Sequence, residues 1–193
     1  WGILFSHPRD FTPVCTTELG RAARLAPEFG KRNVKMIALS IDSVQDHLSW
    51  CKGRFPHSKG CRRSPRRLGG TYVTSQSVRV LKFRAGVGKV FSIFMEQPTK
   101  SRVFIFGPDK KLKLSILYPA TTGRNFDEIL RVVDSLQLTA YKKVATPVDW
   151  KPGDSVMVVP TLPDEEAKKL FPKGVFTKEL PSGKKYLRYT PQP

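Results

Sequence analysis

The chain has 193 residues, which is enough for one domain with a sizeable core, or for one domain followed by an arm. Its formal net charge is +18, but residues 52–100 hold 12 of the 34 Lys and Arg residues against one acidic residue, Glu96. No apolar run is long enough to span a membrane, no signal peptide is recognisable, and three cysteines suit a reduced compartment better than a disulfide scaffold.

The first half of the chain alternates predicted strands and helices. Thr12 is a good N-cap residue and Pro13 suits the first helical position. Strand, helix, strand and helix at this spacing favour βαβ units around a parallel sheet. The elements expected are a strand over 1–5, a loop over 6–11, a helix over 16–30, a strand over 35–42 and a helix over 43–52.

The second half begins with a predicted β-hairpin, whose strands cover 102–107 and 112–118 around a polar turn. Residues 125–139 carry apolar side chains at helical spacing, so they predict an amphipathic helix. From about Ala140 the chain becomes Pro-rich and polar, with a short charged helix expected over 164–170.

The most informative stretch runs from Pro8 to Cys15, with the spacing P-x-x-x-T-x-x-C. It places the Cys15 thiol in the first turn of a helix, where unpaired backbone N–H groups and the helix dipole favour the thiolate. Such sites lower a cysteine pKa from about 8.5 to about 3.5–7.5. The alternative for a cysteine in a helix is a buried structural thiol.

This motif and its flanks resemble the one-cysteine branch of the peroxiredoxins. Similar stretches are Val34–Ser43, Phe106–Lys111, Tyr118–Asn125 and the tail from Thr146 to Pro193. The resemblance implies an α/β, thioredoxin-like fold with a C-terminal peroxiredoxin domain. Residues 1–139 would form the thioredoxin-like domain, and residues 140–193 the C-terminal domain and dimerisation arm of a homodimer.

The resemblance also implies roles for four side chains of this region. Cys15 would be the nucleophile that reduces hydrogen peroxide and organic or lipid hydroperoxides and becomes a sulfenic acid. Thr12 would hydrogen-bond the thiolate and the peroxide, and Pro8 would shield the sulfur. His7 would donate to the substrate or the sulfenate; its alternative is a histidine on a surface loop.

The family also uses an arginine from a distant strand, and Arg102 is the candidate here. Alignment from Phe106 puts Ser101 in the arginine's place, and a one-residue offset turns a strand side chain to the opposite face. A β-bulge could restore Arg102 to the site.

The remaining cysteines, Cys51 and Cys61, lie in no recognisable resolving motif, and the simplest interpretation of Cys51 is a helix-face thiol without catalytic consequence. One-cysteine chemistry then needs an outside thiol, and the resemblance implies glutathione delivered by a glutathione transferase. No bound cofactor is expected, and the three His and three Cys residues show no metal-ligand spacing.

Residues 53–101 do not resemble the family, although their length is nearly preserved. A shifted reading frame and a divergent basic loop both explain this block. Two competing functions depend on it: a non-enzymatic remnant whose altered middle cannot complete a core, and a basic nucleic-acid-binding module using residues 52–102. No nucleic-acid partner is expected, because a basic run without a binding motif is usually a solvated face.

The one-cysteine branch is also associated with a phospholipase built on Ser, His and Asp. Only Asp109 of that set is present here, since the serine and histidine would precede Trp1, so no phospholipase activity is expected of this chain. The resemblance is compatible with peripheral contact between this chain and phospholipid. It implies a cytoplasmic location, with the lysosome as a second one.

Overall fold

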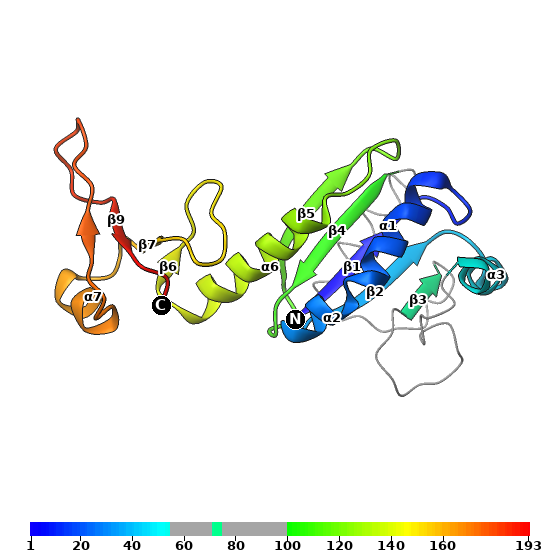
Figure 1. The fold of residues 1–193 in the computed structure, drawn as a ribbon, viewed down its shortest axis with the longest axis horizontal. Coiled ribbons are helices and arrows are strands. Elements are labelled where there is room, and N and C mark those ends of the chain that lie inside the picture. The colour runs from blue at the N-terminus through cyan, green and yellow to red at the C-terminus, as the bar shows by residue number, and fades with distance from the viewer. Residues whose placement is uncertain (55–70, 75–99) are drawn as a thin grey trace. The chain divides into compact units, whose positions relative to one another are not determined.

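The computed structural model describes residues 1–54, 71–74 and 100–193, which form two compact units, Trp1–Phe126 and Asp127–Pro193 (Figure 1). Both units mix helices with sheets, so the predicted α/β class is confirmed. Most of the unmatched block over 53–101, and with it the question of a shifted frame, lies outside the described residues. No described helix has the length and apolar character needed to cross a membrane.

The first unit is built on one five-stranded sheet with the order β3-β2-β1-β4-β5. Strands β1, β2 and β3 run parallel, while β4 and β5 are antiparallel and form the predicted hairpin. Because β1 lies at the centre of the order, the loop that follows it starts from the middle of the sheet. The strands are β1 (Gly2–Ser6), β2 (Lys35–Ser40), β3 (Thr71–Thr74), β4 (Ser101–Phe106) and β5 (Leu112–Tyr118).

The helix predicted over 16–30 is two helices, α1 (Pro13–Arg24) and α2 (Ala26–Lys31). They separate at Leu25, two residues before Pro27, which has no N–H to donate and whose ring would clash with a carbonyl one turn earlier. Helix α3 (Val44–Arg54) matches the helix predicted over 43–52 to within two residues.

The two faces of this sheet carry different side chains. Phe5 pairs in register with Ala38 of β2 and with Val103 of β4, so all three lie on one face. Ala38 also packs with Cys15 and Trp50, and we therefore call this the Cys15 face. The opposite face carries Leu4, Ile37 and Leu39, which form a separate apolar cluster.

The second unit is a small antiparallel sheet with the order β6-β7-β9-β8. Most of helix α6 belongs to this unit rather than to the first domain, where the sequence placed it, because Leu138 packs against the second core and Ser135 hydrogen-bonds to Thr146 at 2.6 Å. Its core contains Val144, Trp150, Val156, Val158, Leu162, Ala167 and Phe171. The elements are α6 (Phe126–Tyr141), β6 (Val144–Ala145), β7 (Val156–Val158), α7 (Asp164–Leu170), β8 (Phe176–Thr177) and β9 (Arg188–Thr190).

Candidate active site

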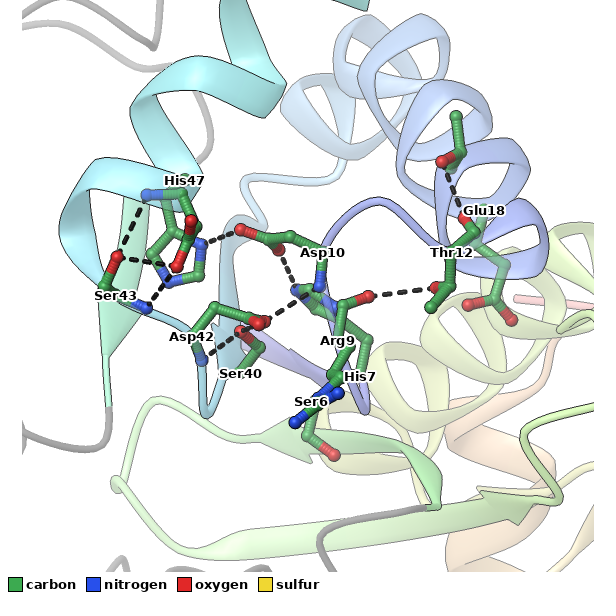
Figure 2. Close-up of polar contacts among 12 residues, drawn as sticks. Ser6, His7, Arg9, Asp10, Thr12, Glu18, Ser40, Asp42, Ser43 and His47 are labelled. Carbon is green, nitrogen blue, oxygen red and sulfur yellow. Dashed lines mark hydrogen bonds and ion pairs between the residues drawn. The ribbon is translucent and has the colours of Figure 1, made fainter.

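Cys15 lies in the first turn of α1, as the motif predicts, and its side chain is buried on the Cys15 face of the sheet. Thr12 occupies the predicted N-cap position with extended backbone, but its hydroxyl does not cap the helix. It donates instead to the Arg9 carbonyl at 2.9 Å (Figure 2). Since a hydroxyl has one proton, Thr12 must turn away from Arg9 before it can donate to a thiolate at Cys15.

The pKa of the Cys15 thiol is raised above its ordinary value, so the lowered pKa expected from the helix position is wrong for this structure. Burial is the main cause, because desolvation disfavours the thiolate. The nearby Thr12 hydroxyl and the positive charge of Arg124 act in the opposite direction, while the Glu18 carboxylate adds to the rise. The helix terminus alone therefore does not produce a thiolate here.

Arg102 does not reach the Cys15 face. It pairs in register with Ser6, one residue after Phe5, so it shares the opposite face with Leu4 and Leu39. No β-bulge restores it, because the pairing of β4 with β1 continues without a shift from Phe106 to Arg102. The register shift in β4 lies between Ile105 and Phe106, in its pairing with β5. By the same alternation Ser101 is on the Cys15 face, as the alignment from Phe106 indicated.

A different arginine reaches the site. Arg124, in the segment before α6, is buried and donates to both carboxylate oxygens of Glu18, from its backbone N–H at 2.9 Å and from Nη2 at 2.7 Å. Its Nη1 donates to the carbonyls of Ser6 and Arg102, each at 3.0 Å. The guanidinium also lies over the Phe5 ring, 5.4 Å from its centre. Arg124 thus joins α1 to the ends of β1 and β4.

The loop after β1 carries a second buried polar group. His7 is fully buried, so the alternative of a surface-loop histidine is wrong. Desolvation, helped by the charge of Arg124, lowers the His7 pKa to about 4, and the imidazole is therefore neutral near pH 7. Asp10 in the same loop has two partners (Figure 2). Its Oδ2 contacts Nδ1 of His47 on α3, and its backbone N–H donates to the Asp42 carboxylate at 2.8 Å.

Comparisons with known proteins show which family the chain resembles. Residues 1–58 match the AhpC/TSA family, and residues 135–174 match the C-terminal domain of 1-Cys peroxiredoxin. Peroxiredoxin-6 of Gallus gallus is 70% identical, and the match covers all of this chain and 86% of that protein. Peroxiredoxin-6 of Homo sapiens is 69% identical with the same coverage.

The chain belongs to the 1-Cys peroxiredoxin family.

Solved structures of peroxiredoxins confirm the thioredoxin-like fold. A cysteine-to-serine mutant of peroxiredoxin 6 from Arenicola marina matches with a TM-score of 0.80 and 53% identity, over all of this chain and 86% of that one. A yeast mitochondrial 1-Cys peroxiredoxin matches with a TM-score of 0.77 and 37% identity, over 99% of this chain and 86% of that one. The predicted fold, with its C-terminal peroxiredoxin domain, is therefore confirmed.

Membership in this family makes the chain a thiol peroxidase of the 1-Cys type. Among the predicted residues, Cys15, Thr12 and His7 surround the start of α1, and Pro8 is half-buried in the loop between them. The side chain of Cys51 and the whole of Cys61 lie outside the described residues. Asp109 lies in the β4–β5 turn, paired at 2.8 Å with Lys113.

Four residues of the site were not identified from the sequence as functional: Glu18, Asp10, His47 and Arg124. Each is charged or titratable and buried, which is unusual without a partner. The partners are far apart in the chain, since 106 residues separate Glu18 from Arg124 and 37 separate Asp10 from His47. The one local signal is that Asp10 lies inside the motif between Pro8 and Cys15.

Proposed function

We propose that this peroxiredoxin reduces hydrogen peroxide and organic hydroperoxides, including lipid hydroperoxides, through Cys15. The thiolate attacks one peroxide oxygen, the O–O bond breaks, and the other oxygen leaves with a proton as water or alcohol. The sulfur becomes a sulfenic acid. One thiol then condenses with it to a mixed disulfide and releases water, and a second thiol attacks that disulfide and regenerates the Cys15 thiol.

The observation that carries this proposal is the position of Cys15 in the first turn of α1, three residues after Thr12. A peroxide oxygen that approaches the sulfur there meets the Thr12 hydroxyl and the positive end of the helix. The positive charge of Arg124 also favours the thiolate. Because β4 presents Ser101 rather than an arginine to this face, we expect the reaction to be slower than in a site with an additional cation.

We propose glutathione as the reductant, delivered by a glutathione transferase. Cys15 is a free thiol, and neither Cys51 nor Cys61 lies in a recognisable resolving motif, so an outside thiol is the simplest route back from the sulfenic acid. The related yeast mitochondrial 1-Cys peroxiredoxin is described as resolving its thiol through glutathione/thioredoxin systems. Thioredoxin is therefore the reductant to compare with glutathione in the assay below.

We further propose a homodimer, with residues 140–193 contributing as the dimerisation arm, in the cytoplasm and secondarily in lysosomes. Strand β5 gives the first unit a second surface for association, since it is an edge strand with Leu112 and Leu117 exposed. Sedimentation of the full chain tests the assembly. A single species with the mass of one chain at all concentrations would contradict it.

The experiment for the peroxidase is a brief, substoichiometric pulse of hydrogen peroxide followed by a sulfenic acid trap and mass spectrometry, with Cys15→Ser as the matched control. We expect rapid labelling confined to Cys15, and turnover when glutathione and the transferase are added. Labelling at Cys15 no faster than at Cys51 or Cys61, together with a broad thermal melt, would favour the non-enzymatic remnant instead. Labelling with turnover by thioredoxin alone would correct only the reductant.

A further inference from the structure

A cluster of four titratable side chains lies beside the peroxidatic helix, and three of them, Asp10, Asp42 and His47, have no role in the chemistry proposed for Cys15. His7 and Asp10 belong to the loop after β1, Asp42 follows β2, and His47 lies on α3 (Figure 2). One ligand atom from each of Asp10, Asp42 and His47 lies within 4.8 Å of the other two. Three separate segments of the chain therefore bring nitrogen and oxygen donors to one place.

Two of the groups that could ligate a metal, the His7 ring and Asp10 Oδ1, have no hydrogen-bond partner among the described residues. His7 is 0% exposed, and neither of its ring nitrogens is hydrogen-bonded there. Asp10 Oδ1 is buried and equally without a partner, and it lies 3.8 Å from His7 Nε2. Leaving a buried polar group unpaired costs about 1–3 kcal/mol, so such groups in a folded protein need an explanation.

The other donors are held in place by their neighbours. Asp42 Oδ2 accepts from the Asp10 N–H at 2.8 Å and from the Ser40 hydroxyl at 2.6 Å. Asp10 Oδ2 contacts His47 Nδ1. Supporting hydrogen bonds of this kind orient the first ligands of metal sites and set their affinity.

We propose that His7, Asp10, Asp42 and His47 form a binding site for a divalent transition-metal ion of the Zn²⁺ type. Zn²⁺ takes four ligands in a tetrahedral arrangement from imidazole nitrogens and carboxylate oxygens, with bonds of about 2.0–2.2 Å. Two ligand atoms of such a tetrahedral ion lie about 3.4 Å apart. His7 Nε2 and Asp10 Oδ1 are 3.8 Å apart, whereas His47 Nδ1 and Asp10 Oδ2 are in direct hydrogen-bond contact and would have to separate to admit the ion. The two unpartnered donors, His7 and Asp10 Oδ1, would then gain a partner.

The donor set decides the class of metal. Ca²⁺ and Mg²⁺ prefer oxygen ligands, six or more for Ca²⁺ and an octahedral set that keeps several waters for Mg²⁺, and this cluster offers two nitrogens and two carboxylates. Imidazole suits zinc, copper, iron and nickel. The proposal stands apart from the peroxidase function, which uses Cys15 with or without a bound metal.

The test uses the full chain with Cys15, Cys51 and Cys61 all changed to Ser, because thiolates bind the same metals. Titration with Co²⁺, followed by competition with Zn²⁺, should show one site with visible absorption bands typical of tetrahedral nitrogen and oxygen ligands. We expect His7→Gln and His47→Gln to weaken binding at least about tenfold. Unchanged affinity in His47→Gln would overturn the proposal.

Two matched controls separate this cluster from other donors. Asp46→Asn removes an exposed carboxylate that is next to His47 in the chain and bonded to Ser43 instead, and His57→Gln removes the third histidine. Both should leave the metal affinity unchanged, and loss of binding in His57→Gln alone would move the site elsewhere. X-ray absorption of the Zn²⁺-loaded thiol-free chain covers variants that fail to fold: imidazole ligands support the site, and oxygen ligands alone contradict it.

Discussion

Each unit of the molecule contains a buried arginine that joins distant segments, Arg124 in the first and Arg188 in the second, but the two have different acidic partners. Arg124 in the first unit pairs with Glu18, whose side chain is 2% exposed. Arg188 in the second unit pairs with Asp164, whose side chain is 78% exposed. Both also donate to two backbone carbonyls: Arg124 to those of Ser6 and Arg102, and Arg188 to those of Val159 and Leu162.

The difference shows what each arginine depends on. A charge buried with its partner is neutralised only by that partner, so removing one member leaves the other uncompensated in a region of low dielectric. A charge paired with a solvated carboxylate can exchange that partner for water. Arg124 should therefore depend strongly on Glu18, whereas Arg188 should rely mainly on its two carbonyl acceptors.

The largest effect should come from Glu18→Gln. This change removes the charge opposite Arg124 while keeping the shape of the side chain, and we expect it to lower the free energy of unfolding by about 3–5 kcal/mol. Urea denaturation followed by circular dichroism measures the loss. Glu28→Gln, in the exposed pairs with Lys31 and Arg32, is the matched control and should cost much less, because water screens these pairs. Equal losses in the two variants would contradict the comparison.

Ser101→Arg tests whether a second positive charge on the Cys15 face makes Cys15 more reactive than Arg124 alone does. Arg124 is fixed by Glu18 and by two carbonyls, so a new cation on the Cys15 face should lower the thiol pKa and stabilise the attacking thiolate. We expect the rate of Cys15 with hydrogen peroxide to rise about tenfold, equivalent to about 1.4 kcal/mol, measured by stopped-flow.

Arg102→Gln is the control for that variant, since Arg102 lies on the opposite face and its removal should leave the peroxide rate unchanged. A fall of tenfold or more in Arg102→Gln would show that this arginine reaches Cys15 after all.

A smaller effect is expected from Asp164→Asn in the second unit. Arg188 keeps its bonds to the Val159 carbonyl at 2.9 Å and the Leu162 carbonyl at 2.7 Å, and water can replace the lost carboxylate. We expect a loss of about 1 kcal/mol or less by urea denaturation. A loss as large as that of Glu18→Gln would mean that exposure of the acidic partner does not separate the two arginines.

The smallest expected effect is a loss of stability that is confined to alkaline pH. Because burial raises the pKa of Cys15, the folded chain holds the thiol proton to a higher pH than the unfolded chain, where the pKa is about 8.5. The unfolded state then binds fewer protons above that pH, so stability falls as pH rises through the interval between the two pKa values. Cys15→Ser should lack this contribution, so the difference in unfolding free energy between the two chains should be constant below about pH 8 and change only above it.

The elements with a local signal were predictable from the sequence. Helix α7 begins and ends at the predicted residues, because Asp164 to Leu170 carries its acids in the first turn and its lysines in the last. The β4–β5 hairpin follows from two apolar runs around a polar turn. By contrast, the strands β6 and β8 have two residues each, too few for a period of two to be recognised.

The site was predictable only where its residues are close in the chain. Thr12 and Cys15 share one motif, and their helical position followed from the spacing. The contacts of Arg124 depend on the packing of the sheet and α1, which no local pattern encodes. The raised pKa of Cys15 depends on burial in the folded unit, so the sequence could indicate the favourable helix terminus but not the larger cost of desolvation.

The separation of 106 residues between Glu18 and Arg124 also matters during protein synthesis. A ribosome adds about 5–20 residues each second, so about 5–20 seconds pass between the appearance of the two residues. During that interval α1 cannot be joined to β1 and β4, and the Cys15 thiol emerges before the structure that buries it. In the growing chain the Cys15 thiol would therefore be accessible to oxidants and chaperones until Arg124 has been added, whereas in the finished fold it is buried.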